Sequence, residues 1–286
     1  MKRIGYRNKH KVRTAIITVI VMICALISIF PFYWMILNSV KDPDLINQGS
    51  TSIFTTKLTW ESYKQAFAYG DGLIWTAYLN SLLIALLSTV GTLFTSSLAA
   101  FAFAKIRFKG SKPLYGLFIA TLMIPGQVTM LPLFMIFAKL QLTNTFIPLI
   151  LPGVMINTYG VFMLRSFIVS IPDGLLEAAD IDGCGYFRKY VRIILPLIKP
   201  AIIAQMLFWF VGIWNDFFGP SIYLTDPEIK TVQVLIMSLN STAGAELGDL
   251  PFVMAAAFIS SLPIILLFIL MNKAFVQTNA TAGIKG

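Results

Sequence analysis

The 286-residue chain is 57% hydrophobic and only 12% charged, with a mean hydropathy of +0.78. A soluble protein of this composition would lack polar surface, so the composition predicts an integral membrane protein. The net charge of +9 comes from Lys and Arg clusters between apolar runs, a pattern that orients helices in a bilayer and argues against a nucleic-acid partner. The length matches one compact bundle without a separate catalytic domain.

Six apolar segments are each long enough to cross a bilayer core, which needs about 20 helical residues. They cover residues 14–37, 74–104, 114–138, 146–167, 197–218 and 252–272. With the amino terminus in the cytosol, the inside segments hold 17 Lys and Arg residues and the outside segments hold 5. This asymmetry predicts an all-α integral membrane fold with six transmembrane helices and both termini cytoplasmic.

The predicted organisation is one transmembrane domain, residues 14–275, between a basic cytoplasmic tail, residues 1–13, and a second cytoplasmic tail, residues 276–286. The basic start followed by an apolar run is similar to a signal peptide. The run is too long for one and lacks a cleavage site of small residues, so we expect it to remain as a signal anchor.

Two of the predicted spans contain helix-breaking residues. Pro125-Gly126 and Pro132 interrupt the third span, and Pro148 and Pro152 interrupt the fourth. Such breaks persist in a membrane only where neighbouring helices or a water-filled cavity satisfy the freed backbone groups. We therefore expect bent helices there, either as packing kinks or as places of contact with a solute.

Few polar side chains lie in or beside the spans, and they are candidates for lining a path. They are Asn80, Gln127, Asn157, Tyr159, Asn215 and Asp216. Hydrogen bonds between helices are the alternative role for each of them. Asp216 is essentially the only acidic residue among the spans, which disfavours a proton or sodium relay.

Several kinds of site are disfavoured by what the sequence lacks. The single histidine, His10, lies in the basic tail, and Cys24 and Cys184 fall at different predicted depths, so neither a metal site nor a disulfide is expected. No histidine cluster, serine–histidine pair or paired intramembrane carboxylate indicates an intramembrane enzyme. No phosphate loop is present, so a nucleotide would have to bind another chain.

The cytoplasmic segment 171–196 has the pattern of a helix-turn-helix. Pro172 and Asp173 are suited to beginning a helix, and Gly183 and Gly185 to ending it with left-handed backbone angles. From Tyr186 onward, helical spacing predicts a second helix with an apolar face and a basic face. The apolar face is Phe187, Tyr190, Val191 and Ile194, and the basic face is Arg188, Lys189 and Arg192.

Two interpretations of this segment are compatible with its residues. It is either a connector lying on the bilayer, anchored by its arginines, or a docking surface for another protein. Ala178 and Ala179 allow a partner to approach the helix backbone closely, while Glu177, Asp180 and Asp182 offer charge.

The same segment resembles the loop that marks the membrane subunits of binding-protein-dependent ABC importers. The matching residues are Glu177, Ala178, Ala179, Gly183, Ile193, Leu195 and Pro196. The resemblance implies that the loop forms coupling helices, which sit in a cleft of a separate ATPase and transmit its closure to the membrane helices. It also implies that Glu177, Ala178, Ala179 and Gly183 are the coupling contacts, and that Pro196 begins the exit into the fifth span.

Weaker matches extend over most of the chain and resemble the carbohydrate branch, specifically the second permease subunit of maltose-type systems. They are Phe30 to Met35, Ser39 to Lys41, Asn80-Ser81, Trp214 to Asp216 and Ala282 to Gly286. The resemblance implies a non-catalytic, multi-pass permease of the cell membrane, surrounded by lipid. Its partners would be a second, different permease, two ATPase subunits that hold ATP and Mg, and an extracytoplasmic solute-binding protein. The chain itself would bind no cofactor.

A neutral polar solute suits spans that are almost free of acidic residues. The same kind of permease for a peptide, amino acid, phosphate or metal chelate is the nearest alternative. A passive pore is a further alternative, but it leaves the cytoplasmic helix-turn-helix without a purpose.

The predicted outside loop 219–251 is too long for a tight connector. The resemblance implies that the corresponding loop reaches into the open solute-binding protein. The contact residues would then be Asn240, Ser241, Thr242, Gly244 and Glu246. A mobile connector without further function is the alternative interpretation.

The charge asymmetry makes a prediction about cysteine accessibility. Cys184 would lie in the cytosol and Cys24 within the bilayer, so a membrane-impermeant thiol reagent added to intact cells should label neither. Permeabilised cells are the positive control for Cys184. Labelling of Cys184 from outside would contradict the predicted topology.

Overall fold

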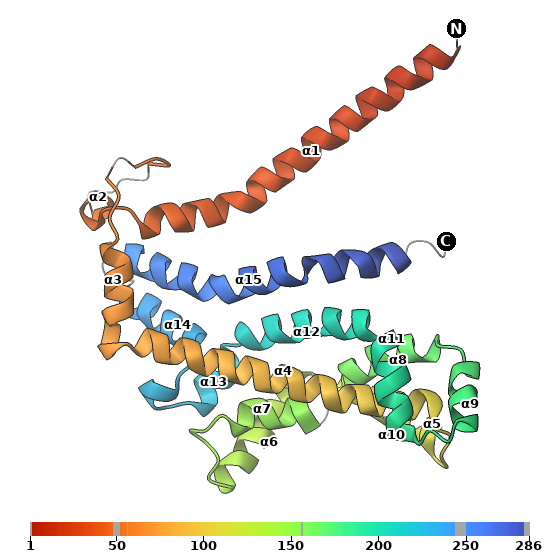
Figure 1. Ribbon diagram of the computed structural model, residues 1–286. Coiled ribbons are helices and arrows are strands. Elements are labelled where there is room, and N and C mark those ends of the chain that lie inside the picture. Colours follow the sequence, from red (N-terminus) through yellow and green to blue (C-terminus); the bar gives the residue numbers. More distant parts are fainter. Residues whose placement is uncertain (1, 48–51, 56, 156, 244–249, 283–286) are drawn as a thin grey trace. The chain divides into compact units, whose positions relative to one another are not determined.

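The computed structural model describes residues 2–47, 52–55, 57–155, 157–243 and 250–282 (Figure 1). Helices dominate this part of the chain, with one antiparallel bridge between Lys41 and Leu58. The helices that form the predicted spans are α1 (Lys2–Ser39), α4 (Leu73–Lys105), α5 (Ser111–Ala120), α6 (Gly126–Lys139), α7 (Ile147–Met155), α8 (Thr158–Val169), α12 (Lys199–Trp214) and α15 (Leu250–Ala282).

Four stretches are long and apolar enough to cross a membrane by themselves, and two bent helix pairs raise the number to as many as six. The four are Arg13–Ser39, Leu73–Lys105, Ile147–Val169 and Leu250–Met271, and the pairs are Ser111–Met123 with Gly126–Lys139 and Tyr186–Leu197 with Lys199–Trp214. Each of the six predicted segments overlaps one of these. The prediction of an all-helical, multi-span membrane protein is confirmed.

The third span bends at one of its two predicted breaks. The helix axis turns by 98° between Met123 and Gly126, because Pro125 has extended backbone angles and lies directly before α6. Pro132 was expected to interrupt the span as well, and this prediction is wrong, since α6 continues through it. Six helical residues precede Pro132 and seven follow it within α6.

The fourth span is interrupted at a different place from the one predicted. Pro148 lies in the first turn of α7, where a missing N–H costs nothing, and Pro152 lies inside α7 without ending it. The helix instead ends at Met155, and α8 begins after Asn157, whose side-chain oxygen accepts a hydrogen bond from the Gly160 N–H at 2.7 Å. The Asn157 cap, rather than a proline, marks the place where α8 begins after the end of α7.

The helices that contain the first and sixth predicted spans extend beyond the apolar segments. α1 begins at Lys2, so the basic segment 1–13 belongs to the first helix from its second residue. α15 runs to Ala282, ten residues beyond the predicted end of the sixth span. The first polar segment precedes its apolar stretch and the last one follows its apolar stretch, and each is continuous with the helix of that stretch.

The chain divides into two compact units, residues 1–72 with 236–260 and residues 73–235 with 261–286. In the first unit the side chain of Lys41 is fully buried. Its ammonium donates to the Ser52 carbonyl oxygen at 2.7 Å and lies over the Trp34 ring. Ser39 and Tyr63 share a hydrogen bond of 2.7 Å nearby, which ties the end of α1 to α3 (Glu61–Ala68).

In the second unit α4 packs against α7, α8 and α12. Its buried face is a row of small and hydroxyl residues at helical spacing: Ser81, Ala85, Ser88, Thr92 and Ser96. Small residues allow close helix approach in a membrane, where apolar surface alone gives no preference for a neighbouring helix over lipid. The other face of α4 exposes large apolar residues, among them Leu83, Leu87, Val90 and Phe94.

The crossing of α4 and α7 is tight enough to make a prediction. A Cβ atom on Gly91 would lie 2.6 Å from Cγ2 of Val154, and Val154 is β-branched and cannot rotate away freely. Gly91→Leu should therefore lower the stability of the purified protein by about 1–3 kcal/mol, the usual cost of overpacking. Val90→Leu is the matched control, because Val90 is exposed. Equal unfolding temperatures for the two variants in detergent would contradict the crossing.

Candidate functional site

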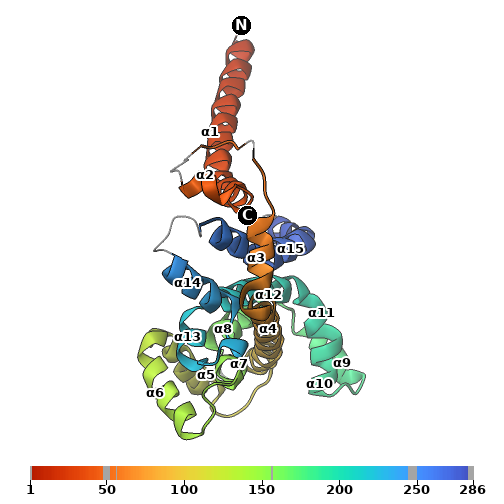
Figure 2. The same cartoon turned by 90° about the vertical axis from the view of Figure 1, so that its left-hand side faces the viewer.

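The segment that carries the coupling motif folds as the predicted helix-turn-helix. α9 (Gly174–Ile181) is followed by a turn and then by a continuous helical stretch made of α10 (Tyr186–Lys189), a π-helical turn (Tyr190–Ile194) and α11 (Leu195–Leu197). Figure 2 shows α9 and α10 side by side. We call residues 171–196 the coupling segment.

Gly183 ends α9 in the way its sequence position indicates. Its φ angle is +70°, in the left-handed region, and the N–H groups of Gly183 and Cys184 donate to the carbonyls of Asp180 and Ala179. This pair of hydrogen bonds is a Schellman motif, which satisfies two of the free carbonyls at the helix end. The prediction for Gly185 is wrong, because its φ of −67° is an angle that any residue adopts.

The start of α9 is held by an ion pair that replaces the expected cap. Asp173 occupies the N-cap position, yet its side chain makes no capping hydrogen bond. Its Oδ1 instead accepts a hydrogen bond of 2.6 Å from Nζ of Lys105, the last residue of α4, and Lys105 also donates to the Ile171 carbonyl. The hydrogen bond and charge of Lys105 lower the pKa of the Asp173 carboxyl from its ordinary value.

A second ion pair joins α9 to α10. Nζ of Lys189 donates to Oδ1 of Asp180 and lies over the Tyr186 ring. Lys189 is only 5% exposed, so it does not share a basic face with the exposed Arg188 and Arg192, as the helical spacing predicted. Of the predicted apolar face, Tyr190 and Ile194 are buried, whereas Phe187 and Val191 are exposed.

Tyr190 connects the coupling segment to α4. Its side chain is 1% exposed, packs on Phe101 with ring centroids 5.9 Å apart, and shares a hydrogen bond of 2.7 Å with Ser97. Since the Ser97 hydroxyl donates to the Phe94 carbonyl, the Tyr190 hydroxyl is the donor to Ser97. Ile194 and Ile198 continue the same buried cluster, together with Leu164 and Ile168 of α8. A π-helical turn frequently marks a functional position in a helix.

The residues of the Glu177-Ala178-Ala179 motif face different ways. Glu177 and Ala178 are exposed, whereas Ala179 is 6% exposed and packs within the chain. Pro196 lies inside α11 with an exposed side chain, at the place where the chain bends by 78° into α12. Of the two alanines, only Ala178 is available to a partner.

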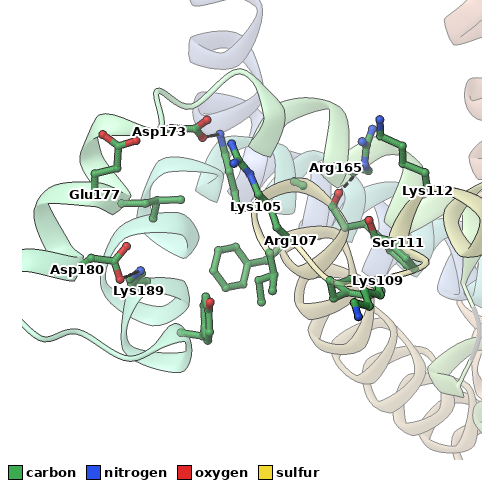
Figure 3. Close-up of a pocket in the computed structure, with 17 residues that line it drawn as sticks. Lys105, Arg107, Lys109, Ser111, Lys112, Arg165, Asp173, Glu177, Asp180 and Lys189 are labelled. Carbon is green, nitrogen blue, oxygen red and sulfur yellow. Dashed lines mark hydrogen bonds and ion pairs between the residues drawn. The ribbon is translucent and has the colours of Figure 1, made fainter.

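A cleft of about 830 Å³ lies between the coupling segment, the end of α4 and the start of α5. Figure 3 shows the carboxylates of Asp173, Glu177 and Asp180 on one side of it. Arg165, Lys109 and Lys112 lie on the opposite side, with Lys105 and Arg107 between the two. Six cations and three carboxylates line it, so its net charge is positive.

The candidate path residues do not form one site. Asn80 donates to the carbonyls of Glu228 and Lys230, at 2.8 and 3.2 Å. The Ser81 hydroxyl beside it accepts from the Val232 N–H at 2.9 Å. These bonds hold the amino-terminal part of α4 to the segment that precedes α14 (Val232–Ala243). Asn80 thus makes structural hydrogen bonds, as in the alternative role.

The other path candidates are distributed over three elements. Asn157 caps α8, and Tyr159 is exposed with its ring edge on Trp209. Gln127 is exposed in the first turn of α6. Asn215 accepts from the Gln233 amide, and Asp216 accepts from the Gly219 N–H. Asp216 also lines a cavity of about 50 Å³ with Ser81 and Thr231.

The predicted outer loop 219–251 is largely helical. It contains most of α13 (Phe218–Tyr223), a 3₁₀ turn (Pro227–Ile229) and α14. Asn240, Ser241 and Thr242 lie in the last turns of α14, and Gly244 and Glu246 lie outside the described residues. The apolar pattern of residues 232–239, which supports α14, is what distinguishes this segment from an irregular loop.

Three residues carry contacts that no local pattern indicates. Lys105 bonds to residues 66 and 68 positions away. The Arg165 guanidinium lies 4.2 Å from the Tyr115 ring centroid. The side-chain oxygen of Asn144 accepts from the Thr225 and Asp226 N–H groups. In the sequence, a lysine or arginine at the end of a span indicates only how that span is oriented, and it does not indicate the side chain's partner.

The Tyr190–Ser97 bond is testable by a double-mutant cycle. Ser97→Ala leaves the buried Tyr190 hydroxyl without its acceptor and should destabilise the protein by about 1–3 kcal/mol. In a Tyr190→Phe background the same change should cost clearly less, because no hydroxyl is left unpaired. Unfolding in detergent measures both. Equal costs in the two backgrounds would contradict the bond.

Comparison with known proteins covers nearly the entire chain. Residues 91–279 match the family described as binding-protein-dependent transport system inner membrane component. The chain is 31% identical to the arabinooligosaccharides transport system permease protein AraQ of Halalkalibacterium halodurans, over 98% of this chain and 99% of that protein. It is also 31% identical to the lactose transport system permease protein LacG of Rhizobium radiobacter, over 90% and 92%.

A solved structure has the same fold. It is a crystal structure of a bacterial ABC transporter involved in the import of the acidic polysaccharide alginate. The TM-score is 0.82 at 22% identity, covering 93% of this chain and 97% of that chain. The multi-span architecture and the helix-turn-helix that is bonded to the end of α4 agree with these matches. The chain belongs to the family of binding-protein-dependent transport system inner membrane components and is a multi-pass membrane permease.

Proposed function

We propose that this permease belongs to an ABC importer for a sugar or oligosaccharide, with both termini in the cytosol and the coupling segment docked on a separate ATPase. The names of the similar permeases, which refer to arabinooligosaccharides and lactose, support the carbohydrate class. ATP and Mg would be held by the ATPase subunits, and this chain would bind no cofactor and catalyse no reaction.

The proposed coupling role is supported by the two ion pairs that attach α9 to its neighbouring helices. Its start is paired to α4 through Asp173 and Lys105, and its last turn is paired to α10 through Asp180 and Lys189. Glu177 and Ala178 are left exposed between these two attachments. A partner that moves α9 therefore moves the end of α4 and the start of the fifth span with it.

α4 offers a path from the cytoplasmic side to the outer side. It is 33 residues long, or roughly 50 Å at 1.5 Å per residue. Its inner end is bonded to the coupling segment through Ser97 and Lys105, and its outer end is bonded to residues 228–232 through Asn80 and Ser81. A displacement of the coupling segment would reach the outer segment through one helix.

The outer segment is the proposed contact with the solute-binding protein. Asn240, Ser241 and Thr242 end α14, and Gly244 and Glu246 follow it in the sequence. We propose that a second, different permease completes the path. The exposed apolar side chains of α4, such as Leu83 and Leu87, are then available to that subunit or to lipid. Gln127, Tyr159 and Asn215 remain proposed solute contacts.

The coupling role makes a prediction with a matched control. Gly183→Val places a β-branched residue at a left-handed φ and should reorient α9 relative to α10, at a local cost of about 1–2 kcal/mol or more. We expect a membrane-inserted protein whose sugar uptake is largely lost. Gly185→Val is the control, because Gly185 has an ordinary φ and open space around its Cα.

Three readouts distinguish the outcomes. Membrane content confirms insertion, co-purification of the ATPase reports docking, and uptake per ATP hydrolysed reports coupling. Near-normal uptake by the Gly183→Val protein would remove the basis for the coupling assignment. Equal loss in both variants would show that the turn tolerates no side chain, whatever its backbone angles.

A further inference from the structure

The cleft beside the coupling segment holds cations that the proposed coupling function does not use. Lys105 and Lys189 are paired to Asp173 and Asp180 within the chain. Arg107, Lys109 and Lys112 line the same cleft, are exposed, and have no ion-pair partner among the described residues. Lys109 and Lys112 lie on the basic side of the cleft and Arg107 lies between its two sides, so three cations of the cleft are without an ion-pair partner there.

Arg165 adds a fourth cation, and its position is set by two contacts. Its Nε donates to the Phe103 carbonyl at 3.3 Å, and its guanidinium stacks on the Tyr115 ring. These contacts involve Nε and the face of the guanidinium, which leaves its two terminal nitrogens for a ligand. An arginine held in this way is suited to an oxyanion with two acceptor oxygens, such as a phosphate.

The start of α5 contributes to the same wall. Ser111 and Lys112, its first two residues, line the cleft. The first turn of α5 has no acidic residue, and its N-cap, Gly110, provides no side-chain acceptor. The partial positive charge of the helix start thus adds to the field of the four cations.

Aromatic rings lie next to these cations. Phe103 packs against Phe108, Tyr115 and Phe118, with ring centroids 5.4–6.1 Å apart. Aromatic residues gather where a membrane meets water, and this cluster lies where α4 ends and α5 begins, between two candidate spans. The cleft therefore offers apolar and cationic surface together, which suits an amphiphile with an anionic head.

We propose that the headgroup of an anionic phospholipid of the cytoplasmic leaflet binds in this cleft, with its phosphate between Arg107, Lys112 and Arg165. The proposal rests on the orientation given under Proposed function, in which this end of α4 is cytoplasmic. Basic pockets between helices on that side of a membrane are known places of lipid headgroup recognition. The volume of about 830 Å³ is within the range of small-molecule sites.

The aromatic cluster favours a lipid over the other anions that could neutralise this wall. A soluble phosphate would gain nothing from the Phe103 and Phe108 rings. An acidic segment of the ATPase would be repelled by the carboxylates of Glu177 and Asp180, which line the opposite wall. A lipid brings an anionic headgroup for the cations and apolar chains for these rings.

The test measures lipids retained by the complete transporter, purified from membranes into nanodiscs of mixed phosphatidylglycerol and phosphatidylcholine. The variant is Arg107→Gln with Lys112→Gln, two exposed side chains that make no hydrogen bond or ion pair with another described residue. The control, Lys57→Gln with Lys139→Gln, removes the same charge at exposed residues away from the cleft. Mass spectrometry gives the ratio of the two retained lipids.

We expect the unmodified protein and the control to enrich phosphatidylglycerol over phosphatidylcholine. The double variant should lose roughly 25-fold in that preference, from about fivefold per cation near a membrane surface. Equal enrichment in variant and control would overturn the proposal. Release of the lipid by millimolar inorganic phosphate would also overturn it, by assigning the cleft to a soluble anion.

Co-purification of the ATPase is recorded in the same samples. Loss of the ATPase from the double variant with unchanged lipid enrichment would show that the cations bind protein, and would overturn the lipid assignment. Lipid retention requires neither sugar uptake nor coupling. A failure of the proposed transport function therefore leaves a different pattern, with normal enrichment and uptake absent from every protein tested.

Discussion

The packing of α4 against α7, α8 and α12 is the interaction on which the second unit depends. In a bilayer, apolar area gives little reason for two helices to leave lipid for each other. The side chains of the row from Ser81 to Ser96 are small, so the backbones of neighbouring helices can approach this face of α4 closely. Close approach increases the dispersion contacts between the helices. Two hydroxyls of this row, those of Ser88 and Ser96, have no hydrogen-bond partner among the described residues. Close approach, rather than polar bonding, is what the row provides.

Neighbouring helices pack against most of the length of α4. Both of its ends can therefore serve as rigid attachment points for other segments. The carboxyl-terminal end of α4 holds the coupling segment through a buried hydroxyl pair and an ion pair. These contacts differ in their exposure: the Lys105 side chain is 6% exposed, but that of Asp173 is 66% exposed. The carboxylates of both ion pairs therefore remain close to water, which avoids the full cost of burying an ion pair.

The cleft brings two different chemistries to one place. Its acidic wall belongs to the coupling segment, and its basic wall belongs to the ends of α4, α5 and α8. A ligand on the basic wall and a partner on α9 would act on helices that share the Lys105–Asp173 contact. Lipid composition and ATPase docking would then influence each other through a change in the same electrostatic field.

The sequence predicted the class of molecule and its apolar spans, because these depend on local quantities, namely apolar length and the position of charges. The coupling role that it predicted from the spacing of Glu177, Gly183 and Pro196 stays a prediction. The sequence also indicated Gly183 as the turn, since glycine is the residue that adopts a left-handed φ at little cost. The hydrogen-bond and ion-pair partners of individual side chains depend on the tertiary structure. Asp173 bonds to Lys105 instead of capping α9, Lys189 turns inward to Asp180, and Asn80 braces an outer segment about 150 residues away. Each of these depends on how distant helices approach one another, and periodicity within one segment contains no information about that approach.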